Sequence, residues 1–105
     1  MRMWKVRPSC LCDRHLLGEH VEMHMFAGSI IKQISLKGYL EKGLVEVHNI
    51  RARHDALSRE MLRRGFRHNS KLRSFGDYKA GRVVISNSMR ELKKRCSVCR
   101  KRIAG

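Results

Sequence analysis

Residues 11–30 read LCDRHLLGEHVEMHMFAGSI, and this stretch decides the fold class. Its apolar side chains recur at the spacing of one helix face, and they are Leu11, Cys12, Leu16, Met23, Phe26 and Ile30. Either Pro8-Ser9 or Asp13 can begin the helix, because these residue types are favoured at helix N-termini. We therefore predict a first helix that runs to about Gln33 and forms one side of a small core.

Two further stretches have the same periodicity. The second begins near Val45 and is expected to end at Gly65, a residue typical of the left-handed cap that stops a helix. The third follows the capping-box spacing of Ser88–Glu91. Its inward face would carry Met89, Leu92, Cys96, Cys99 and Ile103. Three such helices predict an all-α fold.

The connections between these helices are long and polar. Ser35–Gly43 and Arg67–Arg82 contain the glycines typical of loops, and Val83–Ile85 is a candidate short extended piece. A chain of 105 residues has room for one domain. We predict a compact single domain over residues 1–105, with three main helices and long connecting loops.

The charge of the chain indicates a polyanionic partner. It has 24 Lys and Arg against 9 Asp and Glu, a formal net charge of +15, which nucleic acid would screen. The longest weakly polar run, Met23–Ile31, is far shorter than the roughly 20 apolar residues that cross a bilayer. The N-terminus also lacks the apolar segment of a secretory signal. We expect a cytoplasmic monomer with no membrane contact and no obligate protein partner.

Ionisable residues gather on one face of the first predicted helix. At about 100° per residue, His15, Glu19 and Glu22 lie in one stripe that also holds Phe26. Charged groups beside an apolar residue are costly to bury without a purpose, so they are candidate site residues. The alternative is a solvated polar face with an ordinary His15–Glu19 pair.

His20 and His24 form a pair on another face of the same helix. Two histidines four residues apart can bind a metal ion. The zinc-protease signature, however, has Glu directly after the first His, and here Glu22 lies on a different face. We therefore expect a surface or core-edge histidine pair, and a metalloprotease is disfavoured.

The four cysteines lie near the two ends of the chain and leave three interpretations open. Cys10 and Cys12 could join Cys96 and Cys99 in a four-thiolate zinc site that staples the ends together. Cys96 and Cys99 also lie in the apolar stripe of the third helix, where cysteine acts as a small hydrophobe, so buried thiols are preferred. Disulfides are the remaining interpretation. No cofactor is expected, and zinc is the one metal considered.

Two segments of the chain carry a family resemblance. The first is Leu11–Glu22, followed by Phe26-Ala27-Gly28, and the second is Arg51–Phe66, which contains Arg53 and Glu60 and ends in RRGF. The first segment resembles the first helix of the pyrimidine-dimer DNA glycosylases of the phage endonuclease V type. The second segment resembles the second helix of that family and the residues at which that helix ends. The resemblance covers roughly the first two thirds of the chain. It implies a compact helical domain that removes ultraviolet-induced cyclobutane pyrimidine dimers and then nicks the abasic strand.

The resemblance also implies which residues do the chemistry. In that family the nucleophile is the α-amine of the mature N-terminal residue, the acid/base group is a Glu on the first helix, and an Arg beside the terminus supports the reaction. Counting back without gaps from the matched His15 and Glu22 places the nucleophile on Met1 and the supporting Arg on Arg2. Because Arg2 is too large for the usual methionine aminopeptidase, Met1 is expected to remain. The site is therefore expected to contain Met1, Arg2, His15 and Glu22.

An α-amine is a suitable nucleophile, because its reference pKa of about 7.7–8.0, against about 10.4 for lysine, leaves part of it neutral at pH 7. Two arginines that flank the catalytic Glu in the family are replaced here by Val21 and Met25. Other basic residues would then contact the DNA phosphates. The candidates are Arg14, His24, Arg63, Arg64, Lys93 and Lys94.

The sequence thus predicts a DNA glycosylase with abasic-site lyase activity, acting on damaged double-stranded DNA through an imine. The alternative is a non-catalytic nucleic-acid-binding module stapled by zinc. A third interpretation is a basic protein that binds structured RNA. A covalent protein–DNA adduct separates the first interpretation from the other two.

Overall fold

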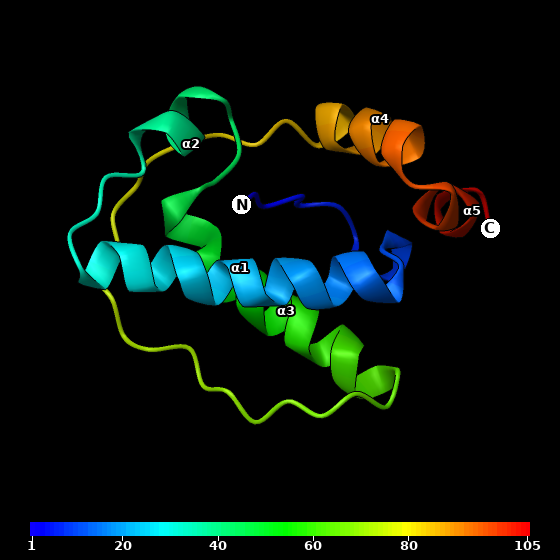
Figure 1. The fold of residues 1–105 in the computed structure, drawn as a ribbon, viewed down its shortest axis with the longest axis horizontal. Helices are drawn as coiled ribbons and strands as arrows, with labels where there is room; N and C mark the ends of the chain where they lie inside the picture. Colours follow the sequence, from blue (N-terminus) through cyan, green and yellow to red (C-terminus); the bar gives the residue numbers. More distant parts are fainter.

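Helix α1 (Asp13–Ile31) is the longest element of the computed structural model, which describes all of residues 1–105 (Figure 1). Cys12 caps its N-terminus, and the Cys12 sulfur accepts the backbone N–H of His15 at 3.4 Å. The predicted first helix is confirmed and begins at Asp13, the second of the two expected starts, because Pro8–Cys10 forms a separate 3-10 turn, η1. The buried residues of α1 are Leu16, Glu19, His20, Met23, Phe26 and Ala27.

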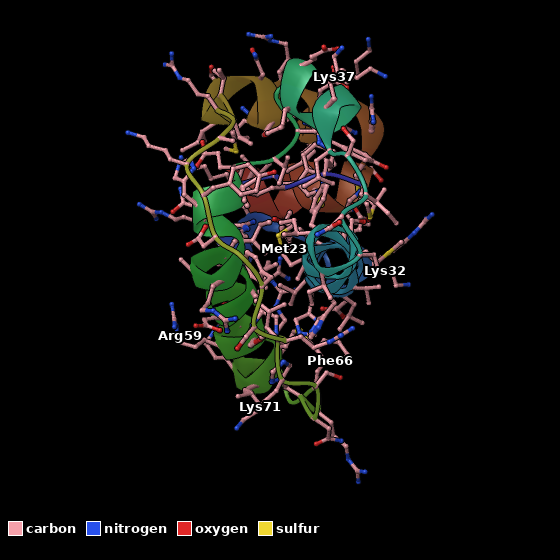
Figure 2. All side chains as sticks on the ribbon, turned by 90° about the vertical axis from the view of Figure 1, so that its left-hand side faces the viewer. Met23, Lys32, Lys37, Arg59, Phe66 and Lys71 are labelled. Atoms are coloured by element: carbon pink, nitrogen blue, oxygen red, sulfur yellow. The ribbon has the colours of Figure 1, made fainter.

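Helix α3 (Ile50–Arg63) packs across α1 (Figure 1). It follows a second 3-10 turn, η2 (Val47–Asn49). The helix stops before Gly65, whose φ of 88° is the left-handed conformation expected of a helix cap. Figure 2 shows Met23 between α1 and α3, where it is fully buried. The predicted second helix and its end are therefore confirmed, but the helix begins at Ile50 and not near Val45.

The rest of the chain differs from the prediction in three places. The expected loop at residues 35–43 contains a short helix, α2 (Lys37–Glu41). The expected third helix is two helices, α4 (Ile85–Arg95) and α5 (Ser97–Ala104). Ile85 therefore begins a helix instead of ending an extended piece, and the structure contains no β-strand.

The break in the third helix lies at Cys96. Its backbone is extended, with φ −134° and ψ 108°, and its sulfur accepts the backbone N–H of Cys99 at 3.4 Å. A side chain that caps a helix N-terminus favours the start of a helix at that position, so the Cys96 cap favours a separate α5 over a continuation of α4. The periodicity of apolar residues cannot reveal such a break, because each half keeps its own apolar face.

The N-terminal segment, residues 1–7, passes through the inside of the fold. It lies between α1 and the layer that contains α2 and α4 (Figure 1). Met3, Trp4 and Val6 are 0%, 6% and 2% exposed. The backbone N–H of Met3 donates to the Leu44 carbonyl at 2.6 Å. This segment is therefore a fixed part of the core, although it has no helix or strand.

One core joins all of these parts. It contains 19 buried apolar residues, and the radius of gyration of 13.4 Å matches the roughly 13 Å of a compact domain of this length. Residues 66–84 contain no helix and run around the outside of α1 and α3 to reach α4 (Figure 1). The all-α, single-domain prediction is confirmed. None of the helices combines the length and the apolar character needed to span a bilayer.

Candidate active site

A cavity of about 550 Å³ opens where the N-terminal segment meets α1 and the end of α4. Its walls are Met1, Arg2, Trp4, His15, Glu22, Lys42, Leu44 and Arg95. The four residues that the sequence placed in one site, Met1, Arg2, His15 and Glu22, all line this cavity. Their chemical roles stay predictions, but the fold brings them together.

The Glu22 carboxylate holds the N-terminus. The backbone N–H of Arg2 donates to Glu22 Oε1 at 2.6 Å. The α-amine of Met1 is three covalent bonds from that nitrogen, so it cannot lie far from the carboxylate. The hydrogen bond from Met3 to Leu44 secures the next residue of the segment. The terminal amine is thus placed near a group that can exchange protons with it.

Arg2 brings a positive charge into the cavity. Its Cζ lies 3.7 Å from the centroid of the Trp4 ring, a cation–π stack that fixes the guanidinium. Burial, and then the nearby Arg95, lower the pKa of Arg2. Its Nε is buried without a hydrogen-bond partner. A guanidinium with unused donors is suited to bind an anion such as a DNA phosphate.

Sequence reasoning missed two other cations of the cavity. Lys42 follows α2 as its C-terminal cap, and Arg95 is the last residue of α4. Both belong to a chain with 24 Lys and Arg, and no local pattern distinguishes them from the others. Only the approach of α4 to the N-terminal segment shows that they share a cavity with Glu22.

Glu19 differs from Glu22, although both lie on the same predicted stripe. The Glu19 side chain is 0% exposed and accepts two hydrogen bonds from Arg53, at 2.6 and 2.8 Å. It also accepts the backbone N–H of Trp4 at 3.1 Å. Burial raises the pKa of Glu19, and the hydrogen bonds from Arg53 oppose that shift. Glu19 therefore anchors the N-terminal segment and does not line the cavity.

His15 belongs to the cavity and also to a cluster with three cysteines. Its Nδ1 lies 3.2 Å from Cys12 Sγ and 3.5 Å from Cys99 Sγ, and Cys96 completes the cluster. The cluster does not include Cys10, so the predicted four-thiolate set is wrong in one member. Cys10 is the last residue of the η1 turn and is a partly buried residue that packs against the core. All four cysteines are free thiols, so the disulfide interpretation is also wrong.

His20 and His24 also have unexpected neighbours. Both face His54 on α3 and His68 in the segment after α3, and one ring nitrogen of each of the four lies within 4.8 Å of the others. His24 Nε2 is 3.1 Å from His54 Nε2. The pair on α1 is therefore half of a four-histidine cluster, and the DNA contact of the half-buried His24 stays a prediction.

The other predicted DNA contacts fall into two groups. Arg14, Lys93 and Lys94 are exposed and free to reach phosphates. Arg63 is exposed but is bound to Glu60 at 2.5 Å. The Arg64 side chain is only 10% exposed and is bound by Glu60, by Asp13 and by two backbone carbonyls. Arg64 therefore ties α3 to the turn before α1, which leaves it little capacity for DNA.

Basic residues also cover the rest of the surface. In Figure 2 the exposed side chains of Lys32, Lys37, Arg59 and Lys71 lie on different sides of the molecule. The net charge of the domain is thus spread widely, and the cavity is distinguished by its carboxylate and its terminal amine.

Comparison with known proteins identifies one family. The family model described as pyrimidine dimer DNA glycosylase matches residues 1–74 of the chain. No curated protein and no solved structure matches the chain. The matched part contains Met1, Arg2, His15 and Glu22, whereas Arg95, Cys96 and Cys99 lie beyond it.

Proposed function

The chain belongs to the pyrimidine dimer DNA glycosylase family, and we propose that it excises cyclobutane pyrimidine dimers and then cuts the abasic strand by β-elimination. The nucleophile in this proposal is the α-amine of Met1, and Glu22 is the acid/base group. The substrate is double-stranded DNA that carries the dimer.

One observation carries the proposal: the hydrogen bond of 2.6 Å between the Arg2 N–H and Glu22 Oε1. It holds the first residue of the chain at the carboxylate, inside a cavity that also contains unpaired positive charge. A reaction that joins an amine to a sugar carbon needs the two groups in a fixed near-attack geometry. A frayed terminus could not provide that geometry, whereas residues 1–7 are fixed here.

The chemistry then proceeds in two stages. The lone pair of the neutral Met1 amine attacks C1′ of the damaged nucleotide, and the glycosidic bond breaks with its electron pair leaving on the pyrimidine. The sugar ring opens, its ring oxygen takes up a proton, and C1′ and the amine nitrogen become an imine. A proton is then lost from C2′ and the bond from C3′ to the phosphate oxygen breaks, which cuts the strand. Water finally hydrolyses the imine and restores the amine.

Glu22 serves both stages. Its carboxylate can accept a proton from the attacking amine, stabilise the cationic imine and take the proton from C2′. The cations around it, Arg2, Lys42 and Arg95, have a separate task. In this proposal they hold the backbone phosphates of a nucleotide that has left the stack, for which Arg95 exchanges its present partner Glu91. A pyrimidine dimer is poorly stacked and paired, so extruding it costs less than extruding a normal base.

The test is covalent trapping with borohydride on duplex DNA that contains one dimer or one abasic site. Protein whose first residue is Met1 should give a reduced adduct, and mass spectrometry should locate the DNA on the Met1 nitrogen. The control is the same protein with an N-terminal extension that a protease removes to leave Met1. The extended form should bind DNA but give no adduct, and proteolysis should restore it. An adduct of equal yield from the extended form would contradict the assignment of Met1.

The second test compares two glutamates. Glu22→Gln should keep DNA binding and lose at least about 100-fold in turnover, the usual scale for a positioned acid/base group. Glu41→Gln, an exposed change on α2, should leave turnover unchanged. A domain that binds duplex DNA but forms no adduct with any substrate would instead be the nucleic-acid-binding module.

A further inference from the structure

Three sulfurs and one imidazole nitrogen converge where the start of α1 meets the junction of α4 and α5. The ligand atoms of Cys12, His15, Cys96 and Cys99 all lie within 4.8 Å of one another. Cys12 Sγ is 3.9 Å from Cys96 Sγ and 3.2 Å from His15 Nδ1, and Cys99 Sγ is 3.5 Å from the same nitrogen. With bonds of about 2.3 Å to sulfur and about 2.0–2.1 Å to nitrogen, tetrahedral zinc places its ligand atoms roughly 3.5–3.8 Å apart. The cluster therefore has the dimensions of a zinc site.

The sulfurs also have the surroundings of metal-bound thiolates. Cys12 and Cys96 each cap a helix and accept a backbone N–H, from His15 and Cys99, at 3.4 Å. Cys99 Sγ accepts the N–H of Cys12 at 3.2 Å. Three N–H donors directed at three sulfurs stabilise negative charge there. A cysteine that served only as a small hydrophobe would need none of them.

We propose that Cys12, His15, Cys96 and Cys99 bind one structural zinc ion. The paired spacings Cys12-x-x-His15 and Cys96-x-x-Cys99 supply two ligands from each end of the chain. The site staples α5, which lies beyond the family match, to the start of α1. The site also fixes His15, which is a ligand, and Arg95, which is next to the ligand Cys96. Both His15 and Arg95 line the candidate active-site cavity. The proposal does not depend on the glycosylase activity, because its test measures the metal.

The first experiment uses the wild-type protein. We expect zinc in the purified domain by elemental analysis, and iodoacetamide should then modify only Cys10, the cysteine outside the cluster. After removal of zinc with a chelator, the half-buried Cys96 should become reactive as well. The same set of modified cysteines before and after chelation would overturn the proposal.

The second experiment replaces zinc with Co²⁺, whose absorption reports the number of bound thiolates. Cys96→Ser should weaken the thiolate-to-cobalt charge-transfer band by about a third, or abolish it, and should release zinc. Cys10→Ser is the matched control and should change neither the band nor the zinc content. A loss of zinc from Cys10→Ser, or full retention by Cys96→Ser, would overturn the ligand set.

The four-histidine cluster supports a second proposal on separate evidence. The ring centroids of His20, His24, His54 and His68 lie 4.7–5.2 Å apart in the pairs that pack together. His54 Nδ1 is 2.9 Å from Asp55 Oδ1, which leaves His54 Nε2 directed at the cluster. A carboxylate on the far nitrogen is the usual partner of a metal-bound histidine.

The other rings agree with this arrangement. His20 Nε2 is buried without a hydrogen-bond partner, and a buried polar atom of this kind needs an explanation. His68 Nε2 is 3.1 Å from Ser58 Oγ, so its other nitrogen is available.

We infer that this cluster binds a second divalent cation of the borderline class that imidazole prefers, with zinc as the probe. Such an ion would join α1 and α3 to the start of the long segment after α3, since His68 is the one ligand outside a helix. The test is zinc titration of protein in which the cysteine site is already loaded.

A further equivalent of zinc should bind to the wild type and to His48→Gln, the control at the one histidine outside both clusters. His68→Asn, which disturbs no helix, should lose that equivalent and keep the first. Binding of Cu²⁺ should give a nitrogen-rich electron paramagnetic resonance spectrum that His68→Asn changes. Equal zinc binding by His68→Asn and the wild type would overturn the second site.

Discussion

The buried ion pair between Glu19 and Arg53 should make the largest single electrostatic contribution to the placement of the N-terminus. The two side chains are 0% and 8% exposed, and their two hydrogen bonds measure 2.6 and 2.8 Å. Glu19→Gln keeps the shape of the side chain but leaves the Arg53 charge buried and unpaired. Breaking a buried pair in this way costs about 3–5 kcal/mol.

That cost is large for a small domain, whose total stability is about 5–15 kcal/mol. At roughly 4–8 °C per kcal/mol, the melting temperature should fall by roughly 12 to 40 °C. The assays are urea unfolding, for the free energy, and thermal unfolding, for the melting temperature. Both are monitored by circular dichroism and by the fluorescence of Trp4, the only tryptophan. Because the backbone N–H of Trp4 donates to Glu19 and the Trp4 side chain is buried, the fluorescence also reports the position of the N-terminal segment.

Two comparisons make this prediction decisive. Glu22→Gln, at the neighbouring half-buried glutamate of α1, should cost only about 1 kcal/mol, the value of an ordinary hydrogen bond. The double variant Glu19→Leu with Arg53→Met should recover much of the loss, because it removes both charges. A cost below about 1 kcal/mol for Glu19→Gln would refute the reasoning, since it would show that the pair is solvated and does not hold the N-terminal segment.

Three further outcomes are expected. For duplex DNA, the logarithm of the binding constant should fall linearly with the logarithm of the salt concentration, and Lys94→Ala should lower the magnitude of that slope by about one unit in a fluorescence titration. An unchanged slope would show that Lys94 does not contact DNA phosphate. Gly81→Ala should lose more than about 1 kcal/mol in urea unfolding, because φ is +89° and a Cβ would lie 2.1 Å from a backbone oxygen; Gly76→Ala, which meets nothing within 4 Å, is the control and should lose less. A hydrogen bond from Arg63 holds the pKa of Glu60 below its usual value, so this contribution to stability is present above the unfolded pKa of about 4.3 and is lost as pH falls below it. Glu60→Gln should therefore lower the melting temperature at pH 7 and differ less from the wild type at pH 3, and a constant difference between the two pH values would contradict the role of this carboxylate.

The sequence by itself determined helices α1 and α3 and four of the residues that line the cavity. The apolar periodicity of α1 and α3 is a local property, and Gly65 marks the end of α3 through its own backbone preference, so both features can be read without a fold. The family resemblance assigned Met1, Arg2 and Glu22 to one site, and in the structure the three residues line one cavity; their chemical roles stay predictions. The periodicity overlooked α2 and the break at Cys96, because a short helix and a cap leave the apolar pattern unchanged.

Tertiary structure alone decided the contacts of residues that share one local sequence pattern. Glu19 and Glu22 lie on one stripe, but only Glu19 meets Arg53, which is 34 positions away in the sequence. Cys10 and Cys12 are near neighbours, but only Cys12 reaches Cys96 and Cys99, at separations of 84 and 87 positions. Contacts at such separations depend on how the helices cross, and helix crossing depends on the packing of the whole core. Local spacing carries no information on that packing, which is why His15 in the cysteine cluster, and His54 and His68 beside His20 and His24, emerged only from the folded chain.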